Sequence, residues 1–412
     1  MDNKLSITHQ TFESLAKKYG TPLYVYDAQL IRKRCTQAVS LFEDLPVSWL
    51  YAIKANDNPH ILKVIRESGV GFDTVSLEEV LLCGHFTDNP AEIFYTENSM
   101  SDEEMNEAIR LGVTLNIGAV SRLERFFQHP DSRECSLRIN PAIGEGHHTR
   151  VNTGDPESKF GVRLDLIDDC VKMADKYGKK IVGLHAHIGS GIKRPENLVA
   201  AMKVLLEAAS GFKDLRMINF GGGVPTPYHP DDQIFDLDEF AKLAGPVLKE
   251  DLENRPEGFR YLFEPGRWYV AEAGTLLTTI HTIKNQVETL YLGTDTGMHH
   301  LLRPMLYDAW HRVENVSKPQ DAPQKVYTIA GNICESGDIL AEDRAMPDSE
   351  VGDVVAIRDA GAYGMTMASQ YNRRSLPGEI LVEKDGVIQV IRAPKNAQET
   401  VNEFLRECAF EV

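Results

Sequence analysis

From about residue 48 to residue 267, one pattern of apolar and polar positions repeats along the chain. Each repeat holds a short apolar run rich in strand-forming residues, a polar turn, and a segment with apolar residues at helical spacing, such as Leu198, Met202 and Leu205. Strands that alternate with helices in this way predict a closed (β/α)8 TIM-like barrel, and the alternative is an open, doubly wound parallel sheet. The apolar runs are LYAIKA, GFDTVS, EIFYTEN, TLNIG, SLRIN, GLHAHIG, MINFGGG and YLFEPGR.

Local signals mark where the predicted helices begin and end. Ser101 and Glu104 have the spacing of a capping box, and Pro195 suits the first turn of a helix. Gly69, Gly112 and Gly178 each suit a position just after the last helical turn.

The pattern changes after about residue 270, where strand-like runs separated by Pro, Gly and Asp predict a second, mostly β-strand domain. These runs are TLLTTIHTI, QVETLYLG, KVYTIAG, DVVAIRD and EILVEKDGVIQVI. Near the start of the chain, TFESLAKKYG predicts a helix and LYVYDA a strand, and we assign both to the β domain. The sequence thus predicts a barrel at 30–270 and a β domain made of 1–29 and 271–412.

Length, charge and cysteine usage narrow the class of protein. A chain of 412 residues suggests two domains. A formal charge of -17 argues against nucleic-acid or anionic-membrane partners, since no basic surplus is available to neutralise phosphates. The six cysteines show no CxxC pair, and the chain contains neither a leader-like N-terminus nor a run of about 18 apolar residues. We therefore expect a soluble, cytoplasmic protein without a structural metal site.

Unusual residues lie at the ends of the predicted barrel strands, where barrel enzymes build their active sites. Lys54 ends the first strand. An amine in such a place can form an imine with an aldehyde cofactor, although a strand-end lysine is more often a solvated terminus. The Gly-Ser turn at 189–190 and the glycines at 221–223 follow the sixth and seventh strands and could bind a phosphate through backbone N–H groups, with plain turn chemistry as the alternative.

Other polar residues near these strand ends allow more than one interpretation. Glu264 could hold a proton on a pyridine nitrogen, or it could be a surface acid or an ion-pair partner of Arg267. His187 could stack on a cofactor ring or simply lie in the core or at the surface. The pairs His147-His148 and His299-His300 lack metal-site spacing, so we interpret them as polar loop positions. The turn-rich segment 142–159 is a candidate active-site loop.

Seven motifs occur in an order that resembles the diaminopimelate decarboxylases, which are fold-type III pyridoxal-phosphate decarboxylases. The motifs are YAIKAN, HAHIGSG, NFGGG, EPGR, RPMLY, CESGD and DAGAYG. The similarity extends from Tyr24 to about Val382. It implies conversion of meso-2,6-diaminopimelate to L-lysine and CO2, the last step of lysine biosynthesis, with pyridoxal 5'-phosphate as cofactor.

The resemblance also implies a role for each matched residue. Lys54 would carry the cofactor, His187 would stack on its ring, and Cys334 would donate a proton from the partner subunit of a homodimer with shared active sites. The implied cofactor-binding residues are Lys54, His187, Ser190, Gly221, Gly222, Gly223, Glu264, Gly266 and Tyr363. The implied substrate-binding residues are Arg267, Arg303, Tyr307, Glu335 and Tyr363.

Some features leave other functions open. Gly191 stands where many members of the family have Gln, and GGGVPTPY departs from their usual GGGF or GGGL, so the substrate could be a related amino acid or a siderophore or antibiotic precursor. An amino-acid racemase is a second possibility, but racemases keep a weaker electron sink at the ring nitrogen than Glu264 would provide. A non-catalytic homologue is the third, and the presence of Lys54 and Cys334 argues against it.

Overall fold

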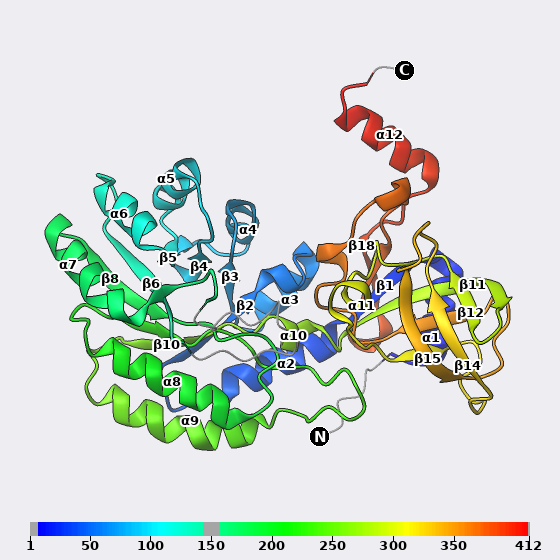
Figure 1. Cartoon of the computed structure of the whole chain (residues 1–412), viewed down its shortest axis with the longest axis horizontal. Coiled ribbons are helices and arrows are strands. Elements are labelled where there is room, and N and C mark those ends of the chain that lie inside the picture. Colours follow the sequence, from blue (N-terminus) through cyan, green and yellow to red (C-terminus); the bar gives the residue numbers. More distant parts are fainter. Residues whose placement is uncertain (1–6, 143–156, 411–412) are drawn as a thin grey trace. The chain divides into compact units, whose positions relative to one another are not determined.

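The computed structural model describes residues 7–142 and 157–410, and these residues form two compact units (Figure 1). The barrel unit comprises residues 34–226 and 233–268. The β unit comprises, within the described ranges, residues 7–33, 227–232 and 269–410.

In the described part of the barrel unit, eight parallel strands close into a barrel. Neighbouring strands pair in the order β5-β4-β3-β2-β10-β9-β8-β6, and an additional pairing of β5 with β6 closes the ring. The closed ring confirms the predicted (β/α)8 barrel and excludes the doubly wound sheet. The strands are β2 (Val47–Ala52), β3 (Gly71–Thr74), β4 (Ile93–Thr96), β5 (Thr114–Ile117), β6 (Glu134–Asn140), β8 (Lys180–His185), β9 (Met217–Asn219) and β10 (Arg260–Phe263), with a short β7 (Val162–Arg163) beside β6.

Helices lie around the outside of the barrel strands (Figure 1). The capping box of Ser101 and Glu104 is present, and Gly112 and Gly178 end their helices in the left-handed conformation, as the sequence predicts. The helices are α3 (Pro59–Glu67), α4 (Leu77–Cys83), α5 (Asp102–Leu111), α6 (Val120–Gln128), α7 (Ile167–Tyr177), α8 (Pro195–Ala209) and α9 (Leu237–Leu252). The chain passes between the two units within α2 (Ala28–Ser40) and α10 (Arg267–Val270), and also on either side of residues 227–232.

Aromatic side chains stabilise the barrel where its first and last strands meet. Trp49 of β2 is the register partner of Phe263 of β10, and their rings stack with centroids 4.9 Å apart. Phe240 of α9 meets Phe263 edge-on at 5.7 Å, so the same cluster fixes a helix against this joint. Each such ring pair contributes about 0.5–1.5 kcal/mol beyond the burial of its area.

The β unit contains a mixed sheet in which the described residues contribute nine strands. β1 (Leu23–Asp27) pairs with β11 (Gly274–Asn285) on one side and β17 (Gly378–Val382) on the other, so the N-terminal strand lies inside this sheet. The remaining strands are β12 (Leu290–Thr294), β13 (Val313–Asn315), β14 (Lys325–Ala330), β15 (Ile339–Met346), β16 (Val354–Ile357) and β18 (Ile388–Arg392).

Among the described residues, helices α1, α11 and α12 accompany this sheet, and the sequence did not predict α11, α12, β13 or β15. α1 (His9–Tyr19) buries Phe12 and Leu15, and α11 (Arg303–Tyr307) is a single short turn. α12 (Ala397–Glu407) was missed although Asn396 and Glu399 form a capping box before it. β15 was missed because its centre, Glu342 to Arg344, is charged, and acidic residues are rare in strands. Within the described ranges, no helix is long and apolar enough to cross a membrane.

Candidate active site

Lys54 is an exposed side chain in an otherwise buried stretch at the end of β2. It lies in a short 3-10 turn, η1 (Ile53–Ala55), whose two flanking residues are buried. Its Nζ is 3.7 Å from Oδ2 of Asp73, a buried carboxylate in β3. The other oxygen of Asp73 is buried and has no hydrogen-bond partner among the described residues. The strand end therefore presents an amine beside a carboxylate that retains an open acceptor.

Glu264 follows β10 and is buried by neighbouring strands. Its Oε2 accepts a hydrogen bond of 2.7 Å from Nδ2 of Asn219 at the end of β9, and its Oε1 lies 3.0 Å from Nε2 of His185 at the end of β8. Since three consecutive barrel strands supply these groups, the carboxylate is built into the barrel. The alternative that Glu264 is a surface acid is wrong.

Burial dominates the protonation of this cluster. It raises the pKa of Asp73 well above its ordinary range, with the nearby charge of Glu264 adding to the effect and Lys54 opposing it. It also raises the pKa of Glu264, against Lys54 and the Asn219 hydrogen bond, and it raises the pKa of the neighbouring Glu79 to about 7. Burial lowers the pKa of His185 well below 6.5, so its ring is neutral and contacts Glu264 through Nε2.

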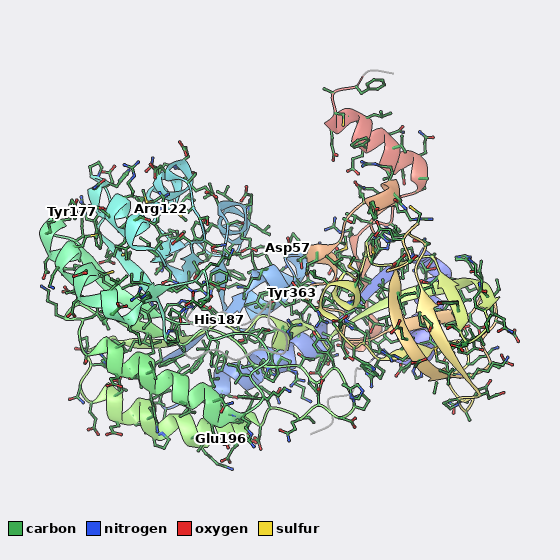
Figure 2. All side chains as sticks on the ribbon, viewed as in Figure 1. Asp57, Arg122, Tyr177, His187, Glu196 and Tyr363 are labelled. Atoms are coloured by element: carbon green, nitrogen blue, oxygen red, sulfur yellow. The ribbon has the colours of Figure 1, made fainter. Side chains whose placement is uncertain are left out.

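His187, labelled in Figure 2, comes two residues after His185 and is fixed by the glycine-rich turn that follows β9. Nδ1 of His187 accepts a hydrogen bond of 3.0 Å from the backbone N–H of Gly222. Burial and the charge of Lys54 lower the pKa of His187 well below 6.5. The ring is therefore neutral, and its remaining N–H is on Nε2.

The two predicted glycine-rich turns meet. The backbone N–H groups of Gly191 and Ile192 both donate to the carbonyl oxygen of Gly223, at 3.2 and 3.0 Å. A Cβ at Gly222 would lie 2.7 Å from the carbonyl oxygen of Glu264, and a Cβ at Gly223 would lie 2.8 Å from that of Gly189. These glycines are therefore required by close backbone approach, which goes beyond ordinary turn chemistry.

Two neighbours of Glu264 connect it to the lysine and to the turns. A Cβ at Gly266 would lie 2.9 Å from the carbonyl oxygen of Ala52, so this glycine lets the turn after β10 pack against the segment that carries Lys54. Nη2 of Arg267 donates to Oγ of Ser190 at 3.4 Å. This contact places the Arg267 guanidinium beside the Gly-Ser turn, and it does not place it on Glu264.

The donor set of the barrel unit fits pyridoxal 5'-phosphate. Lys54 offers an amine for the aldehyde, and the buried Glu264 offers a carboxylate for the ring nitrogen. The glycines at 221–223 approach neighbouring backbone too closely for side chains, and the adjoining turn at 189–191 contributes the hydroxyl of Ser190, so the two turns suit a phosphate.

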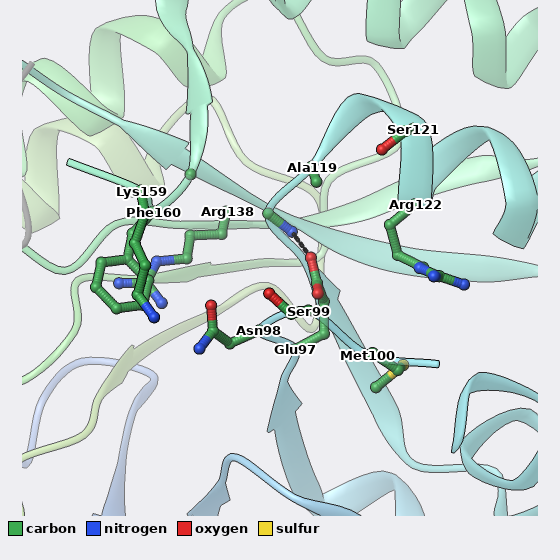
Figure 3. A pocket seen from close by; sticks show the side chains of 12 residues that line it. Glu97, Asn98, Ser99, Met100, Ala119, Ser121, Arg122, Arg138, Lys159 and Phe160 are labelled. Atoms are coloured by element: carbon green, nitrogen blue, oxygen red, sulfur yellow. Dashed lines mark hydrogen bonds between the residues drawn. The ribbon is translucent and has the colours of Figure 1, made fainter. Parts of the chain in front are cut away.

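A polar cavity of about 290 Å³ lies at the same strand ends, beyond β4, β5 and β6. Glu97 accepts the backbone N–H of Gly118 at 2.9 Å, and the guanidinium of Arg138 lies over the ring of Phe160, with 4.6 Å to its centroid (Figure 3). Burial lowers the pKa of Arg138, while Glu264, Asp73 and Glu97 raise it. Arg138 thus joins this cavity electrostatically to the carboxylates near Lys54.

Sequence reasoning missed Asp73, Asn219 and Arg138. Each is a polar residue inside a predicted barrel strand, GFDTVS, MINFGGG or SLRIN, and lies in the last half of the observed strand. Buried polar side chains are uncommon in such strands unless they are paired, so this position was an available signal.

The remaining predicted site residues belong to the β unit. Arg303 is buried, its Nη1 lies 2.9 Å from Nε2 of His311, and its guanidinium lies over the ring of Tyr228. Tyr307 ends α11. Tyr363 has a left-handed backbone with φ of 57°, a conformation that costs energy for a residue other than glycine.

Cys334 and Glu335 are both exposed in the loop between β14 and β15. This exposure distinguishes Cys334 from the buried cysteines of the described chain. Nδ2 of Asn372 donates to Sγ of Cys334 at 3.1 Å, and the hydroxyl of Tyr371 donates to the carboxylate of Glu335.

Histidine pairs outside the barrel strands were interpreted as polar loop positions. His299 and His300 do lie in a turn, but both side chains are buried, which corrects that interpretation. His147-His148 and most of the predicted active-site loop, 142–159, lie outside the described residues.

Comparison with known proteins identifies the family. Residues 28–271 match the model of the pyridoxal-dependent decarboxylase, pyridoxal binding domain. Diaminopimelate decarboxylase of Methanothermobacter thermautotrophicus is 38% identical over 401 residues, which cover 95% of this chain and 92% of the relative. The chain belongs to the diaminopimelate decarboxylase family. Membership confirms the predicted cofactor, pyridoxal 5'-phosphate, and the enzyme class, a carboxy-lyase.

Solved structures of diaminopimelate decarboxylases share the fold of this family member over nearly its whole length. The Helicobacter pylori enzyme complexed with L-lysine has a TM-score of 0.87 at 29% identity, covering 96% of this chain and all of that one. The M. jannaschii enzyme in co-complex with L-lysine has a TM-score of 0.85 at 30% identity, covering 95% and 93%. A lysine/ornithine decarboxylase of Vibrio vulnificus, at 22% identity and a TM-score of 0.78, shows the shared fold alone.

Proposed function

We propose that this enzyme decarboxylates meso-2,6-diaminopimelate at its D centre and releases L-lysine and CO2, the last step of lysine biosynthesis. The observation that carries the proposal is the 38% identity to a diaminopimelate decarboxylase over 95% of the chain. The lysine complexes of the Helicobacter pylori and M. jannaschii enzymes support it, because L-lysine is the product of the proposed reaction.

Each barrel residue has a distinct task in this proposal. When bound, pyridoxal 5'-phosphate supplies an aldehyde that joins amines and a ring that accepts the electron pair left on Cα as CO2 departs. Lys54 anchors the aldehyde through Nζ, and Asp73 accepts protons from this amine at 3.7 Å. Glu264, oriented by Asn219 and His185, holds a proton on the ring nitrogen.

His187 and the glycine-rich turns hold the cofactor in place. Because Gly222 fixes Nδ1 of His187, the flat face of the imidazole is available to stack on the ring. Ser190, the glycine-rich turn at 221–223 and Tyr363 form the phosphate site in this proposal. The N–H groups of Gly221 and Gly222 donate to Asn219 and His187, so the N–H of Gly223 is the one assigned to the phosphate. The contact of Arg267 with Ser190 supports a contribution of Arg267 to the phosphate site as well as to substrate binding.

Specificity depends on the far end of the substrate, which carries a carboxylate and an ammonium group. Arg303 and Tyr307 bind that carboxylate in our proposal, and Glu335 accepts the ammonium. An arginine–carboxylate contact contributes about 1.5–3 kcal/mol, and leaving a buried arginine without its anion adds a further cost. Sites built in this way reject substrates that lack the group by about 10⁴-fold.

Cys334 and Glu335 act, in this proposal, on the active site of the partner subunit in a homodimer. Their exposure on the β unit supports this, since a residue that serves another chain must be accessible from outside. Cys334 donates the proton that replaces CO2 on Cα. Mixing an inactive Lys54→Ala chain with an inactive Cys334→Ala chain should restore part of the activity, because heterodimers contain one intact composite site. No recovery after verified subunit exchange would contradict the shared site.

The division into a barrel at 30–270 and a β domain at 1–29 and 271–412 remains a prediction, and so does a cytoplasmic location. The formal charge of -17 supports our proposal that the protein binds neither nucleic acid nor anionic membranes, because such partners are negatively charged themselves.

A substrate panel tests the proposed function. CO2 release from meso-diaminopimelate should exceed that from L-lysine, L-ornithine and L-arginine by about 10⁴-fold in kcat/KM. Comparable values would refute the substrate and favour a decarboxylase of a related amino acid or of a siderophore or antibiotic precursor. Racemisation of an amino acid without CO2 release would favour a racemase.

A further inference from the structure

Two loops of the β unit are joined by a run of side-chain hydrogen bonds in antiparallel order. Tyr371 donates to the carboxylate of Glu335, Asn372 donates to Sγ of Cys334 at 3.1 Å, and Nη2 of Arg374 donates to the carbonyl oxygen of Asn332 at 3.0 Å. Each step forward along 371–374 is thus a step back along 332–335. All three donors lie in 371–374. The segment 369–375, hereafter the clamp, therefore holds the loop that carries Cys334.

The clamp is itself fixed at both ends by the buried histidine pair. The backbone N–H of Ser369 donates to the carbonyl oxygen of His299 at 2.7 Å. Nε2 of His300 donates to the carbonyl oxygen of Ser375 at 3.0 Å. A segment anchored at each end can place its middle residues reproducibly.

The backbone in the middle of the clamp adopts a conformation that costs conformational free energy. Asn372 and Arg373 both have left-handed φ, 54° and 56°, in the short helix η6 (Tyr371–Arg373). Asn adopts this conformation more readily than most residues, but two such residues in succession still cost free energy. In this conformation the amide of Asn372 reaches the sulfur of Cys334.

We propose that Tyr371 and Asn372 are positioning residues that hold Glu335 and Cys334, respectively, in their working conformations. The expected effects on turnover rest on the proposed function, whereas the expected change in the reactivity of Cys334 does not. An amide N–H directed at sulfur orients the side chain and stabilises a thiolate. A hydroxyl donated to a carboxylate restricts the rotamer of a long, exposed side chain, which otherwise samples several conformations.

The reactivity of Cys334 tests the contact with Asn372 without any substrate. The full-length holoenzyme is treated with iodoacetamide at one fixed pH, and alkylation is followed by mass spectrometry at Cys334 and at Cys408, the other exposed cysteine, which serves as an internal reference. Asn372→Gly removes the amide and suits a positive φ, so it should slow alkylation of Cys334 about threefold relative to Cys408. Asn372→Asp places a carboxylate near the sulfur and should slow it further.

Arg373→Gly is the matched control, because it relaxes the neighbouring left-handed position and leaves the Asn372 amide in place. Within the described part of the chain, Arg373 contacts Gln370 and the ring of Phe404 and makes no hydrogen bond to Cys334. Equal slowing in Arg373→Gly and Asn372→Gly would overturn the proposal, because backbone relaxation would then explain the effect. Unchanged alkylation of Cys334 in Asn372→Gly would overturn it as well.

Steady-state kinetics provide the second readout. Asn372→Gly should lower kcat with little change in KM, because Cys334 acts after binding, whereas Tyr371→Phe should raise the KM for meso-diaminopimelate more than it lowers kcat. Loss of the same parameter in both variants would contradict separate roles. If the wild-type enzyme does not act on meso-diaminopimelate, the proposed function fails, and the alkylation result still decides the clamp.

Discussion

Asn219 donates a hydrogen bond of 2.7 Å to Glu264 inside the barrel. The other oxygen of Glu264 contacts His185, and the two contacts together fix the plane of the carboxylate. Glu264→Gln should lower kcat on the order of a hundredfold, because the ring nitrogen loses the anion that keeps it protonated. Asn219→Ala should lower kcat about tenfold, the scale of one charge-assisted hydrogen bond. Turnover of meso-diaminopimelate measures both, and a larger loss in Asn219→Ala than in Glu264→Gln would contradict the assigned roles.

Lys54→Ala should abolish turnover, because the cofactor would lose its covalent anchor. Lys63→Ala is the control. Lys63 is an exposed lysine of α3, and its Nζ lies 3.9 Å from Oε1 of Glu67 on the same helix. The holoenzyme should also lose its near-visible absorbance band in Lys54→Ala and keep it in Lys63→Ala. Near-normal turnover of the cofactor-saturated Lys54→Ala protein would refute the role of Lys54.

Gly222→Ala should weaken cofactor binding and destabilise the barrel, because the new Cβ would lie 2.7 Å from the carbonyl oxygen of Glu264. Gly245→Ala is its control, since Gly245 lies inside α9 and no atom outside its chain neighbours and its own helix comes within 4 Å of the position of a Cβ. That substitution should leave cofactor binding unchanged and change stability little, because the gain in helix propensity is opposed by crowding of the new Cβ against Pro246. Cofactor titration and thermal unfolding of both variants measure the difference, and equal behaviour would argue against the close approach.

His299 should make the β unit sensitive to acid. Burial lowers the pKa of His299 from 6.5 to about 4, so between these values the unfolded chain binds a proton that the folded chain does not. Stability therefore falls as the pH drops through this range. His299→Phe should reduce the stability lost between pH 7.5 and pH 5 by about 1 kcal/mol, after allowance for solvent screening. Urea unfolding at the two pH values tests this, and an unchanged difference between them would refute it.

Much of the fold was predictable because its signals are local. Each barrel strand is a short apolar run bounded by turn residues, and Gly112, Gly178 and the capping box at Ser101 follow rules that act within a few residues. The less regular elements were harder to predict. β15 carries charges and a left-handed residue, Asp343, so its strand character depends on pairing with β14.

The site divides in the same way. Lys54, the glycines at 221–223 and Glu264 were predicted because motif and strand end coincide in the sequence. Asp73 and Asn219 were missed because nothing beside them in the chain shows that they meet Lys54 and Glu264. Their positions near strand ends become informative only once the barrel closes and brings β2, β3, β9 and β10 together.

The sequence by itself determined the order of strands and helices, the family and the chemical groups available, because periodicity, caps and motifs are written within short stretches of chain. Only the tertiary structure decided which groups meet. It placed Asn219 on Glu264, Gly223 against the Gly189 turn, and Asn372 on Cys334, across 45, 34 and 38 residues of chain. Such contacts form because the closed barrel and the paired strands bring distant segments together, and their partners are fixed by backbone geometry that no local pattern contains.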